Sequence, residues 1–296
     1  MAISRAQLVK ELEPGLNALF GLEYKRYDNQ HAEIYTNESS DRAFEEEVML
    51  SGFANANVKV EGSGVNYDQS QETYTARYTH DTIALAFAIT EEAIEDNLYD
   101  RISSRYTKAL ARSMSNAKQV KAAAPLNNGL PTVDGFDSGD GVSLFNTSHT
   151  TVSGTNVKNT LTTQADLNET SLEQALIDIA AFTDERGLRV AAKGMKMIIP
   201  SANQFSAERL LKSQGRTGTA DNDINAVASM GMVPQGYRVN NFLTDSDSWY
   251  IITDVPNGMK MFTRAPLTTA MEGDFDTGNV RYKARERYSF GVSDYR

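Results

Sequence analysis

Residues 90–124 contain neither glycine nor proline, and their apolar side chains recur at helical spacing, which predicts one long helix. Thr90 can cap its start by accepting a hydrogen bond from a backbone N–H of the first turn. Acidic residues fill the first turns and basic residues the later ones, the order that the helix macrodipole favours. Pro125 should end the helix, which at 1.5 Å per residue would be roughly 50 Å long.

The apolar stripe of this predicted helix is not straight. Its members stand at every fourth position: Ile94, Leu98, Ile102, Tyr106, Leu110 and Met114. Four residues turn the helix by about 400°, so the stripe drifts by about 40° at each step. We therefore expect the two ends of the helix to pack against different elements and interpret the helix as a spine between subdomains.

Length and composition exclude several classes of protein. A chain of 296 residues suffices for one large or two ordinary domains. The net charge of −10 argues against a general nucleic-acid binder but leaves room for a local basic face. The lack of cysteine excludes disulfides and thiolate metal sites. No apolar run is long enough to span a membrane and no signal peptide is recognisable, so we expect a cytosolic origin and no membrane partner.

The first 45 residues read as an arm. Ser4 and Gln7 form a capping box for a short helix, which Pro14 and Gly15 should break. Residues 16–24 would form a second short helix. Residues 25–45 are polar and lack periodicity, so we expect an extended segment lying over something else, with the glutamates at 45–47 on a solvated face.

Residues 46–80 are typical of a hairpin. Val58 and Val60 lead into a turn cluster at 61–64, and a second strand alternates apolar with polar residues at 74–79. The apolar side chains are Val58, Val60, Tyr74, Ala76 and Tyr78. They are too few for a core, and an isolated hairpin is marginal in water, so a partner from this chain or another is needed. Residues 83–89 form an apolar strand leading into the long helix.

Residues 126–166 form a long connection rich in Gly, Asn, Thr and Ser. Loops of this length inside compact domains are usually functional or ordered by a partner. Asp134, Asp137 and Asp140 lie in a Gly-rich stretch, which makes a calcium loop conceivable. The spacing is not that of an EF-hand, and turns favour Asp and Gly in any case. We expect neither a metal nor a cofactor.

Residues 167–254 indicate a compact α/β unit. Thr170 and Glu173 would cap a helix that Gly187 ends. A buried strand at 195–199 precedes a helix that Ser201 and Gln204 would cap and that should end near residue 215. A polar and mobile loop follows at 216–223, and another strand at 249–255.

The last segment, residues 255–296, returns to β structure. One face of the predicted strand at 280–292 is apolar and the other is basic, the latter carrying Arg281, Lys283, Arg285 and Arg287. The basic face is either solvated, as one side of an antiparallel sheet often is, or a ladder that meets acidic segments of a neighbouring copy, or DNA.

No catalytic motif stands out. His31, His80 and His149 lack a metal-binding spacing, and neither a nucleophile elbow nor a phosphate-binding or dinucleotide-binding fingerprint occurs. Carboxylates are abundant, so a glycosidase-like pair remains open. An enzyme is the weaker class.

The order of arm, hairpin, long helix, α/β unit and returning strands resembles the major capsid protein of tailed bacteriophages, an α+β fold named after phage Hong Kong 97. Specific stretches look like the branch with Mu-like head subunits. These stretches are residues 140–145 with His149, 197–200 followed by 207–211, 241–245 before Trp249, and 287–296.

The resemblance implies a division of the chain. The parts are an N-terminal arm at 1–45, an E-loop hairpin at 46–80, a P-domain at 81–166 with its spine helix at 90–124, an A-domain at 167–254, and C-terminal P-domain strands at 255–296. No long extension precedes the arm, so we expect no fused scaffolding domain.

The resemblance also implies a function. The chain would assemble into hexamers and pentamers of an icosahedral shell around a double-stranded DNA genome, and would be found in the virion after assembly in the host cytoplasm. Scaffold, portal and decoration proteins are possible partners, and packaged DNA would be held only by weak, non-specific contact. The alternatives are an encapsulin-like compartment of the same fold and an enzyme with an unrecognised carboxylate site.

We expect two sets of residues to take part in assembly. Contacts between subunits are expected at Val58, Val60, Glu61, Tyr74, Arg77, Arg281, Lys283, Arg285 and Arg287. The loop at 216–223 is expected near the centre of each capsomer, through Arg216, Thr217, Asp221 and Asp223.

Overall fold

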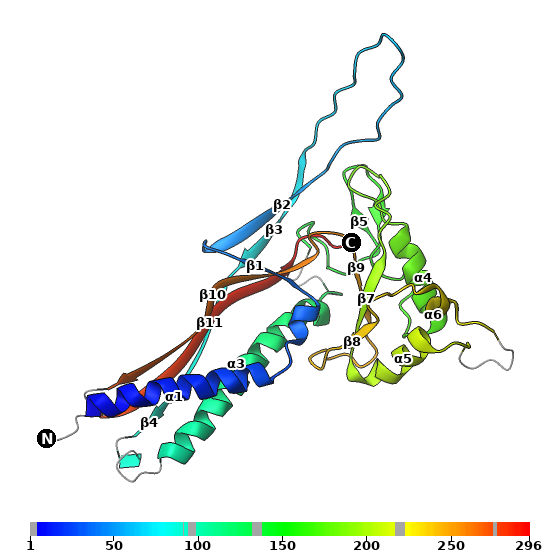
Figure 1. Ribbon diagram of the computed structural model, residues 1–296. Helices are drawn as coiled ribbons and strands as arrows, with labels where there is room; N and C mark the ends of the chain where they lie inside the picture. The colour runs from blue at the N-terminus through cyan, green and yellow to red at the C-terminus, as the bar shows by residue number, and fades with distance from the viewer. Residues whose placement is uncertain (1–4, 91, 94–98, 132–137, 217–222, 275–276) are drawn as a thin grey trace.

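The computed structural model describes residues 5–90, 92–93, 99–131, 138–216, 223–274 and 277–296. The chain has three parts: a long sheet covered by two helices, a compact α/β unit, and a hairpin that projects beyond both (Figure 1). The architecture is α+β, as the sequence predicts.

The long sheet has the strand order β1-β10-β11-β4. These strands are β1 (Thr36–Ser39), β4 (Asp81–Ile89), β10 (Met259–Gly273) and β11 (Val280–Val292). β1 runs parallel to β10, whereas β11 is antiparallel to both of its neighbours. The alternation predicted for β11 is confirmed, since Tyr282 and Ala284 are buried while Arg281, Lys283 and Arg285 are exposed. The helices thus cover one face of the sheet, and the other face is open along residues 281–285 of β11 but covered farther along by the hairpin base.

Two helices cover the apolar face: α1 (Arg5–Arg26) and α3 (Tyr99–Asn127). Leu16 and Phe20 of α1 share a core with Met114 of α3 and Tyr282 of β11. The expected break at residues 14 and 15 is therefore wrong, because α1 runs through Pro14 and the burial of its apolar face against α3 and the sheet outweighs the lost hydrogen bond. The capping box predicted at Ser4 lies outside the described residues.

The long helix contacts different elements in its middle and near its end, in keeping with the drifting stripe. In its middle, Met114 packs against α1, whereas near its end Ala122 and Leu126 pack with Ile198 and Tyr288. The predicted end at residue 124 is wrong. Pro125 sits in the last turn and the helix continues to Asn127, because a proline removes only its own N–H there and the N–H of residue 128 still bonds to the carbonyl of residue 124 at 2.9 Å.

The start of this helix is described only in part. The hydroxyl of Thr90 accepts a hydrogen bond from the N–H of Ala93 at 3.4 Å, in keeping with the predicted cap. Residues 91 and 94–98 lie outside the described residues, and the described helix begins at Tyr99. Ile94 and Leu98 of the predicted stripe are therefore not placed.

The arm lies over its own chain. A short 3-10 helix, η1 (Gln30–Glu33), leads into β1. Ile34 and Tyr35 are buried in the core beneath the end of α3. The Tyr35 hydroxyl donates to the carbonyl of Ala122 at 2.7 Å, and the N–H of His31 donates to Gln119 at 3.0 Å. The arm therefore extends over α3 of its own subunit, as expected of a segment that lies over another element.

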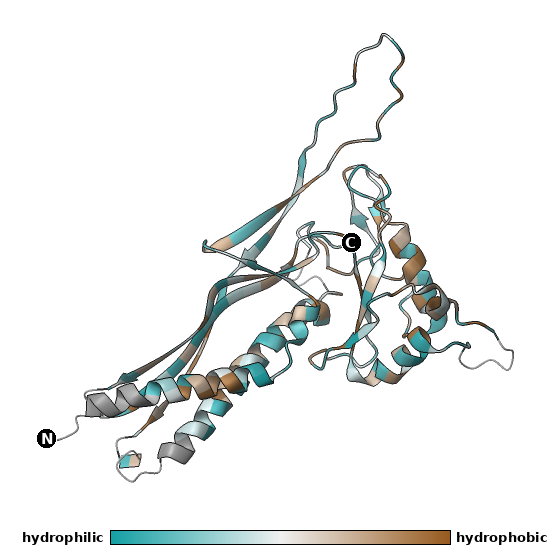
Figure 2. Cartoon of the chain, in the orientation of Figure 1, coloured by the Kyte–Doolittle hydropathy of each residue, from teal (hydrophilic) through white to brown (hydrophobic). Residues whose placement is uncertain are grey.

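The α/β unit is built on a three-stranded sheet of order β8-β7-β9. Its strands are β7 (Gly194–Ile199), β8 (Tyr237–Val239) and β9 (Tyr250–Thr253), and its helices are α4 (Glu169–Ala180), α5 (Gln204–Lys212) and α6 (Ala226–Met230). Figure 2 shows the hydrophobic residues of α4 in brown. Leu172 and Leu176 of α4, Met197 and Ile199 of β7 and Leu210 of α5 form its core.

The helix caps of this unit differ from the prediction. Asn168 caps α4 and forms a capping box with Ser171, two residues before the predicted pair. An Asn accepts the N–H bonds of a first turn as well as Thr does, so composition alone does not distinguish the two registers.

The predicted helix ends are also too late. α4 ends at Ala180, and Gly187 instead occupies a later turn with a φ of 84°. Ser201 starts a 3-10 turn, η2 (Ser201–Asn203), that has no side-chain cap, and α5 ends at Lys212.

In the described residues of the long connection, 128–131 and 138–166, the only strands are β5 (His149–Thr150) and β6 (Asn156–Val157), which pair with each other. Leu144 and Val157 nevertheless pack against Phe182 of the α/β unit and Val292 of β11. The connection is thus ordered by its own chain. Asp134 and Asp137 lie outside the described residues.

Candidate assembly surfaces

The hairpin consists of a paired base and an unpaired tip. The base strands are β2 (Phe44–Leu50) and β3 (Glu72–Thr79), paired antiparallel. The first strand therefore starts earlier than predicted, and Val58 and Val60 lie in the irregular segment at 51–71. A ladder forms at the base because its side chains pack on the subunit's own sheet, a support that the tip lacks. The predicted turn is confirmed, since the N–H of Ser63 bonds to the carbonyl of Val60 at 3.1 Å.

The base of the hairpin is seated on the long sheet. Tyr78 and Ala76 are buried against Phe262 of β10, and the rings of Tyr78 and Phe262 meet edge to face at 4.8 Å. The expectation that these side chains build no core within their own subunit is therefore wrong. A Cβ added at Gly291 would come within 2.6 Å of the Tyr78 ring, so the close packing of Tyr78 on β11 requires glycine at that position.

Charged groups add to the packing of the hairpin base on the long sheet. The ammonium of Lys260, whose side chain is buried, lies 3.1 Å from Glu38 of β1 and 2.5 Å from Glu47 of β2. Burial lowers the pKa of Lys260, but the two carboxylates outweigh that effect and the pKa is raised. Ser293 donates a hydrogen bond to Glu47 and also contacts the hydroxyl of Tyr78. Residues of β1, β2, β3 and β10 and the residue that follows β11 thus meet at this contact.

A second cluster of side chains packs around the start of β3. Tyr74 stacks on Tyr295 with ring centroids 6.4 Å apart, and Tyr295 stacks on the buried His149 at 3.8 Å. His149 Nδ1 lies 2.6 Å from Asp140. Gly139, with a φ of 80°, leaves room for the Tyr74 ring. Tyr74 is half-buried within its own subunit, and its expected contact with a neighbouring subunit stays a prediction.

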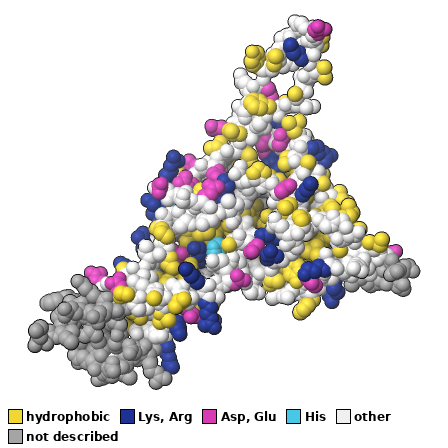
Figure 3. All heavy atoms as spheres, in the orientation of Figure 1, with side chains coloured by type: hydrophobic (Ala, Val, Ile, Leu, Met, Phe, Trp, Pro, Cys, Tyr) yellow, Lys and Arg dark blue, Asp and Glu magenta, His cyan; other side chains and the backbone are white. Residues whose placement is uncertain are grey.

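The tip, by contrast, is exposed. Phe53 and Val60 are 60% and 70% exposed, Val58 is 95% exposed and Tyr67 is 97% exposed. Figure 3 shows these hydrophobic side chains in yellow along the projecting segment. Its neck touches the α/β unit, where Arg186 donates to the carbonyl of Gln69 at 2.5 Å. An apolar surface of this kind marks a contact with another molecule.

The outer face of the hairpin base is also partly apolar. Phe44, Val48 and Leu50 of β2 are exposed. The guanidinium of Arg77 lies over the ring of Phe44 at 3.9 Å and pairs with Glu46 at 3.4 Å. Arg77 remains available at the surface, since more than half of its side chain is exposed.

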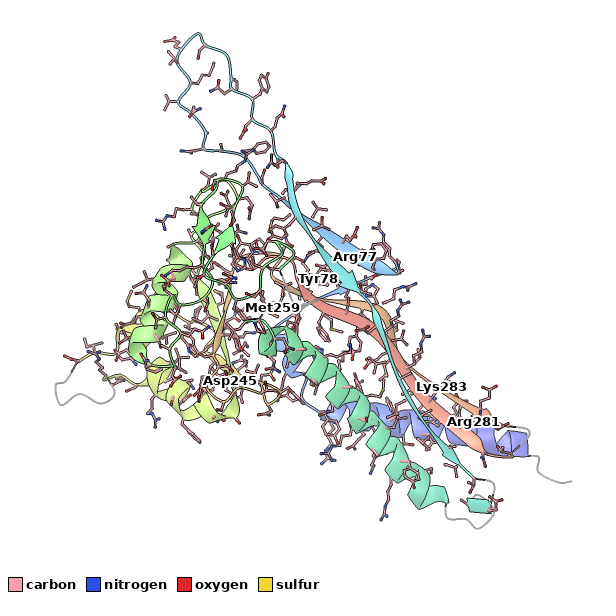
Figure 4. The ribbon with its side chains drawn as sticks, turned by 180° about the vertical axis from the view of Figure 1, so that it is seen from behind. Arg77, Tyr78, Asp245, Met259, Arg281 and Lys283 are labelled. Atoms are coloured by element: carbon pink, nitrogen blue, oxygen red, sulfur yellow. The ribbon has the colours of Figure 1, made fainter. Side chains whose placement is uncertain are left out.

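The open face of the long sheet carries the basic ladder, Arg281, Lys283, Arg285 and Arg287. Figure 4 labels Arg281 and Lys283 along β11. The neighbouring positions of β4 on this face are small: Ala84 lies opposite Arg285, Ala86 opposite Lys283 and Ala88 opposite Arg281. Arg281 pairs with Asp274, whereas the other three have no ion pair within the described parts of the chain.

The predicted loop at 216–223 is closed at its base. The N–H of Arg216 donates to the carbonyl of Asp223 at 2.9 Å, and its guanidinium pairs with Glu169 of α4 at 2.7 Å. Thr217 and Asp221 lie outside the described residues.

The histidines have structural partners. His80 lies between Ser40 and Ser289 at 2.9 and 3.0 Å. Burial, with a contribution from Lys118, lowers the pKa of His31 to about 4. Over the ranges that the structure describes, no three His, Asp or Glu side chains gather as metal ligands, and no helix is long and apolar enough to cross a bilayer.

Comparison with known families decides what these surfaces belong to. A family model described as phage capsid protein matches residues 73–296, well over half of the chain. The chain belongs to the phage capsid protein family. It is a major capsid protein, the subunit of an icosahedral shell, and the resemblance noted from the sequence is confirmed at this level.

Solved capsid structures have the same fold. The capsid of an empty GTA particle matches with a TM-score of 0.56 and 14% identity, covering 91% of this chain and 88% of that one. A virus-like particle from Pyrococcus furiosus matches with 0.52 and 10%, covering 95% and 94%. The capsid of the Myoviridae phage XM1 matches with 0.51 and 12%, covering 88% and 86%.

The family match does not distinguish between branches of phage capsid proteins. No curated protein matches the chain. The Mu-like branch is not singled out and stays a prediction. Membership in a capsid family indicates a structural rather than a catalytic role for this capsid protein.

The seat of the hairpin was missed in the sequence of this capsid protein, although a signal for it exists. Gly291 interrupts the alternating pattern of β11, and an isolated glycine in a strand often marks close approach of another chain segment. That pattern does not identify Tyr78 as the approaching residue.

Proposed function

We propose that this capsid protein assembles through its hairpin tip into hexamers and pentamers, the capsomers of the shell. The observation that carries the proposal is the contrast between the seated base and the exposed tip, where Val58 and Tyr67 are almost fully accessible. A stable protein interface buries more than about 1,000 Å², and a projecting hairpin can supply much of this area when it lies across an adjacent subunit.

Val60 and Glu61 at the turn extend this contact, and Arg77 on the outer face of the base adds a cation. Each subunit gives its tip to one neighbour and receives a tip from another. Such a heterologous contact closes into a ring where the rotation permits.

The basic ladder is a second contact between subunits in this proposal. Lys283 stands between Ala86 and Ala270, Arg285 stands between Ala84 and Thr268, and neither forms an ion pair within the described residues. A neighbouring acidic segment can approach such a flat face closely. Each exposed pair contributes less than about 1 kcal/mol, but the contact is repeated at every subunit.

The loop at 216–223 then lies near the centre of each capsomer. The proposal rests on the polar, Gly- and Asp-rich composition of this loop, whose base is closed by the hydrogen bond from Arg216 to Asp223. Trypsin should cleave after Arg216 in free subunits and not in capsomers. Equal cleavage in both forms would count against this placement.

Assembly takes place in the host cytoplasm in this account, and the shell encloses double-stranded DNA. Scaffold, portal and decoration proteins are partners that a shell of this class can use. The net charge of −10 disfavours tight binding of a packed genome, which is compatible with its later release.

Electron microscopy of the purified protein tests the proposal. The expected result is closed shells, or rings of five and six subunits. Small discrete particles of one or two subunits at every concentration and salt would contradict it. An encapsulin-like compartment would give shells that exclude DNA, so the nucleic-acid content of purified shells separates the two alternatives.

A further inference from the structure

The long helix α3 has an unusual charge distribution for a chain of net charge −10. Residues 101–127 contain no Asp or Glu. The basic residues in this stretch are Arg101, Arg105, Lys108, Arg112, Lys118 and Lys121. This is a local basic element within an acidic protein.

These basic residues divide by face. Lys118 turns toward the sheet and lies 3.3 Å from the buried carboxylate of Glu286, and Lys121 pairs with Asp81 at 2.5 Å. Both therefore have structural partners within the subunit.

The remaining basic residues with described side chains point into solvent. Arg105, Lys108 and Arg112 are exposed and form no ion pair within the described residues. They stand at positions i, i+3 and i+7, so they form one stripe about 10 Å long on the surface of the helix. We call these three residues the α3 stripe.

The α3 stripe borders a groove between the two helices. Lys108 and Arg112 line this groove together with Glu23 of α1 and Tyr27, which follows α1, and its volume is about 560 Å³. The carboxylate of Glu23 is engaged by its own helix, 3.6 Å from Arg26 and within reach of the Tyr27 hydroxyl at 3.1 Å. The exposed end of α1 adds the positive charges of Lys25 and Arg26.

The surface between the basic side chains is small and polar, formed by Ala109, Ser113 and Asn116. The large exposed apolar side chains near the stripe are Tyr106, whose ring packs against Phe87 of β4, and Leu22 of α1. They are outnumbered by the basic groups, whereas the centre of a protein interface is depleted of charge and rich in aromatic residues. Phosphate groups, by contrast, are contacted by isolated Lys and Arg side chains with water between them. The composition of the stripe thus fits a polyanion better than a second protein.

The basic ladder lies on the other side of the same sheet. The helices cover the face that carries Tyr282 and Ala284, and Lys283 and Arg285 point away from them. If the sheet lies along the wall of a shell, one of the two basic surfaces faces the interior and the other faces outward.

We propose that the α3 stripe faces the interior of the shell and binds the phosphate backbone of packaged double-stranded DNA. This inference rests on the proposed function, and it assigns the interior face to the helices rather than to the sheet. With about three phosphates contacted per subunit, binding is weak, independent of sequence and strongly dependent on salt. The repetition of the stripe over the inner wall makes the total contact substantial.

The first test measures DNA binding by unassembled subunits. Fluorescence anisotropy of a labelled duplex of about 20 base pairs should show an association constant that falls about 40-fold between about 50 and about 200 mM salt. The variant Arg105→Gln, Lys108→Gln, Arg112→Gln should bind at least about tenfold more weakly at low salt and lose most of the salt dependence.

A matched control removes the same number of charges from the other face. The variant Lys283→Gln, Arg285→Gln, Arg287→Gln should bind DNA within about twofold of the wild type. Equal losses in the two variants, or a larger loss in the ladder variant, would overturn the assignment of the α3 stripe. Circular dichroism of both variants shows whether a loss of DNA binding is caused by unfolding.

The second test locates the stripe in the shell. The chain has no cysteine, so Arg112→Cys introduces a unique thiol. A maleimide coupled to a polymer too large to enter the shell should label Arg112→Cys in free subunits but not in shells. Labelling of Arg112→Cys in intact shells would place the stripe outside and overturn the proposal.

The two tests also separate the possible occupants. Protection of Arg112→Cys in shells combined with unchanged DNA binding by the triple α3 variant would mean that another subunit covers the stripe, which contradicts the proposal. If the wild type forms no shells at all, the proposed function fails, and the anisotropy measurement still decides whether the stripe binds DNA.

Discussion

The ring of Tyr78 on β3 lies directly over Gly291 on β11, where any Cβ would come within 2.6 Å of the ring. The φ angle of Gly291 is not in the left-handed region, so the requirement for glycine at this position is purely steric. The contact joins the hairpin to the strand that runs through the middle of the long sheet. The direction of the hairpin is therefore fixed by the fold of its own subunit.

Replacing Gly291 by alanine tests this steric requirement. Because the Tyr78 ring is confined between Phe262 and β11, Gly291→Ala should lower the free energy of unfolding by about 1–3 kcal/mol. Gly273→Ala is the matched control, since a Cβ at that position on the neighbouring strand meets nothing within 4 Å. Urea denaturation followed by circular dichroism provides the measurement. Equal costs for the two variants would show that the ring does not constrain position 291.

The ion pairs of Lys260 predict a second stability effect. Lys260→Met leaves Glu38 and Glu47 facing each other without a cation, so it should cost about 2 kcal/mol. Lys283→Met removes an exposed lysine without an ion pair in the described chain and should stay within about 0.5 kcal/mol of the wild type. Thermal unfolding of both variants compares the two lysines. A loss no larger for Lys260→Met than for Lys283→Met would contradict the role of the pairs.

Glu286 predicts a dependence on pH. Burial raises the pKa of Glu286 above its ordinary value of 4.5, although the nearby Lys118 and Tyr24 partly offset the shift. A carboxyl group with a raised pKa binds more protons in the folded than in the unfolded state. Its contribution to stability is therefore complete below about pH 4.5 and is lost as the pH rises through the folded pKa.

Glu286→Gln removes this titration. The stability of the variant relative to the wild type should therefore increase between pH 4.5 and about pH 7. Urea denaturation at both pH values measures the difference, and the exposed Glu272→Gln is the control. A relative stability that stays constant, or that decreases with rising pH, would show that Glu286 is not held with a raised pKa.

The basic ladder predicts a defect in assembly rather than in folding. Lys283→Glu with Arg285→Glu should impair shell formation most at low salt, because screening weakens exposed charge pairs as salt rises. Arg189→Glu with Lys193→Glu reverses two exposed charges on the α/β unit and should assemble normally if only the ladder contributes. Light scattering over a salt series follows assembly. Wild-type behaviour of the ladder variant at low salt would show that this face is merely solvated.

The sequence predicts the elements of this fold better than the contacts between them. Periodicity identifies the long helix, the alternation of β11 and the buried strand β7, because each has a strong repeat on its own. Pro14 and Pro125 are misjudged because the rule for proline in helices describes an isolated helix, whereas packing against the sheet and the arm holds α1 and α3 together through these residues.

The same limit applies to the candidate surfaces. The exposure of Val58 and Val60 and the basic ladder are readable from local patterns. The seat of Tyr78 depends on residues 184 and more positions away, such as Phe262 and Gly291, whose proximity follows from the sheet topology alone. The contact of Tyr74 with Tyr295 of its own subunit could not be predicted from the sequence for the same reason, and its contact with a neighbour stays a prediction.

The central claim is that the base of the hairpin belongs to its own subunit whereas the tip belongs to the neighbour. Replacing residues 55–67 by a short Gly-Ser turn tests it, because the hydrogen bond from the Ala54 N–H to Asp68 at 2.7 Å already closes the neck. A companion variant keeps the length and changes Phe53, Val58, Val60, Val65 and Tyr67 to serine.

Circular dichroism and thermal melting report the fold of these variants, and electron microscopy of the purified proteins reports assembly. The account predicts that both variants melt like the wild type and that neither forms shells. Normal shells from the shortened protein would contradict the role of the tip, and a loss of the folded state would show that the tip belongs to the core of its own subunit.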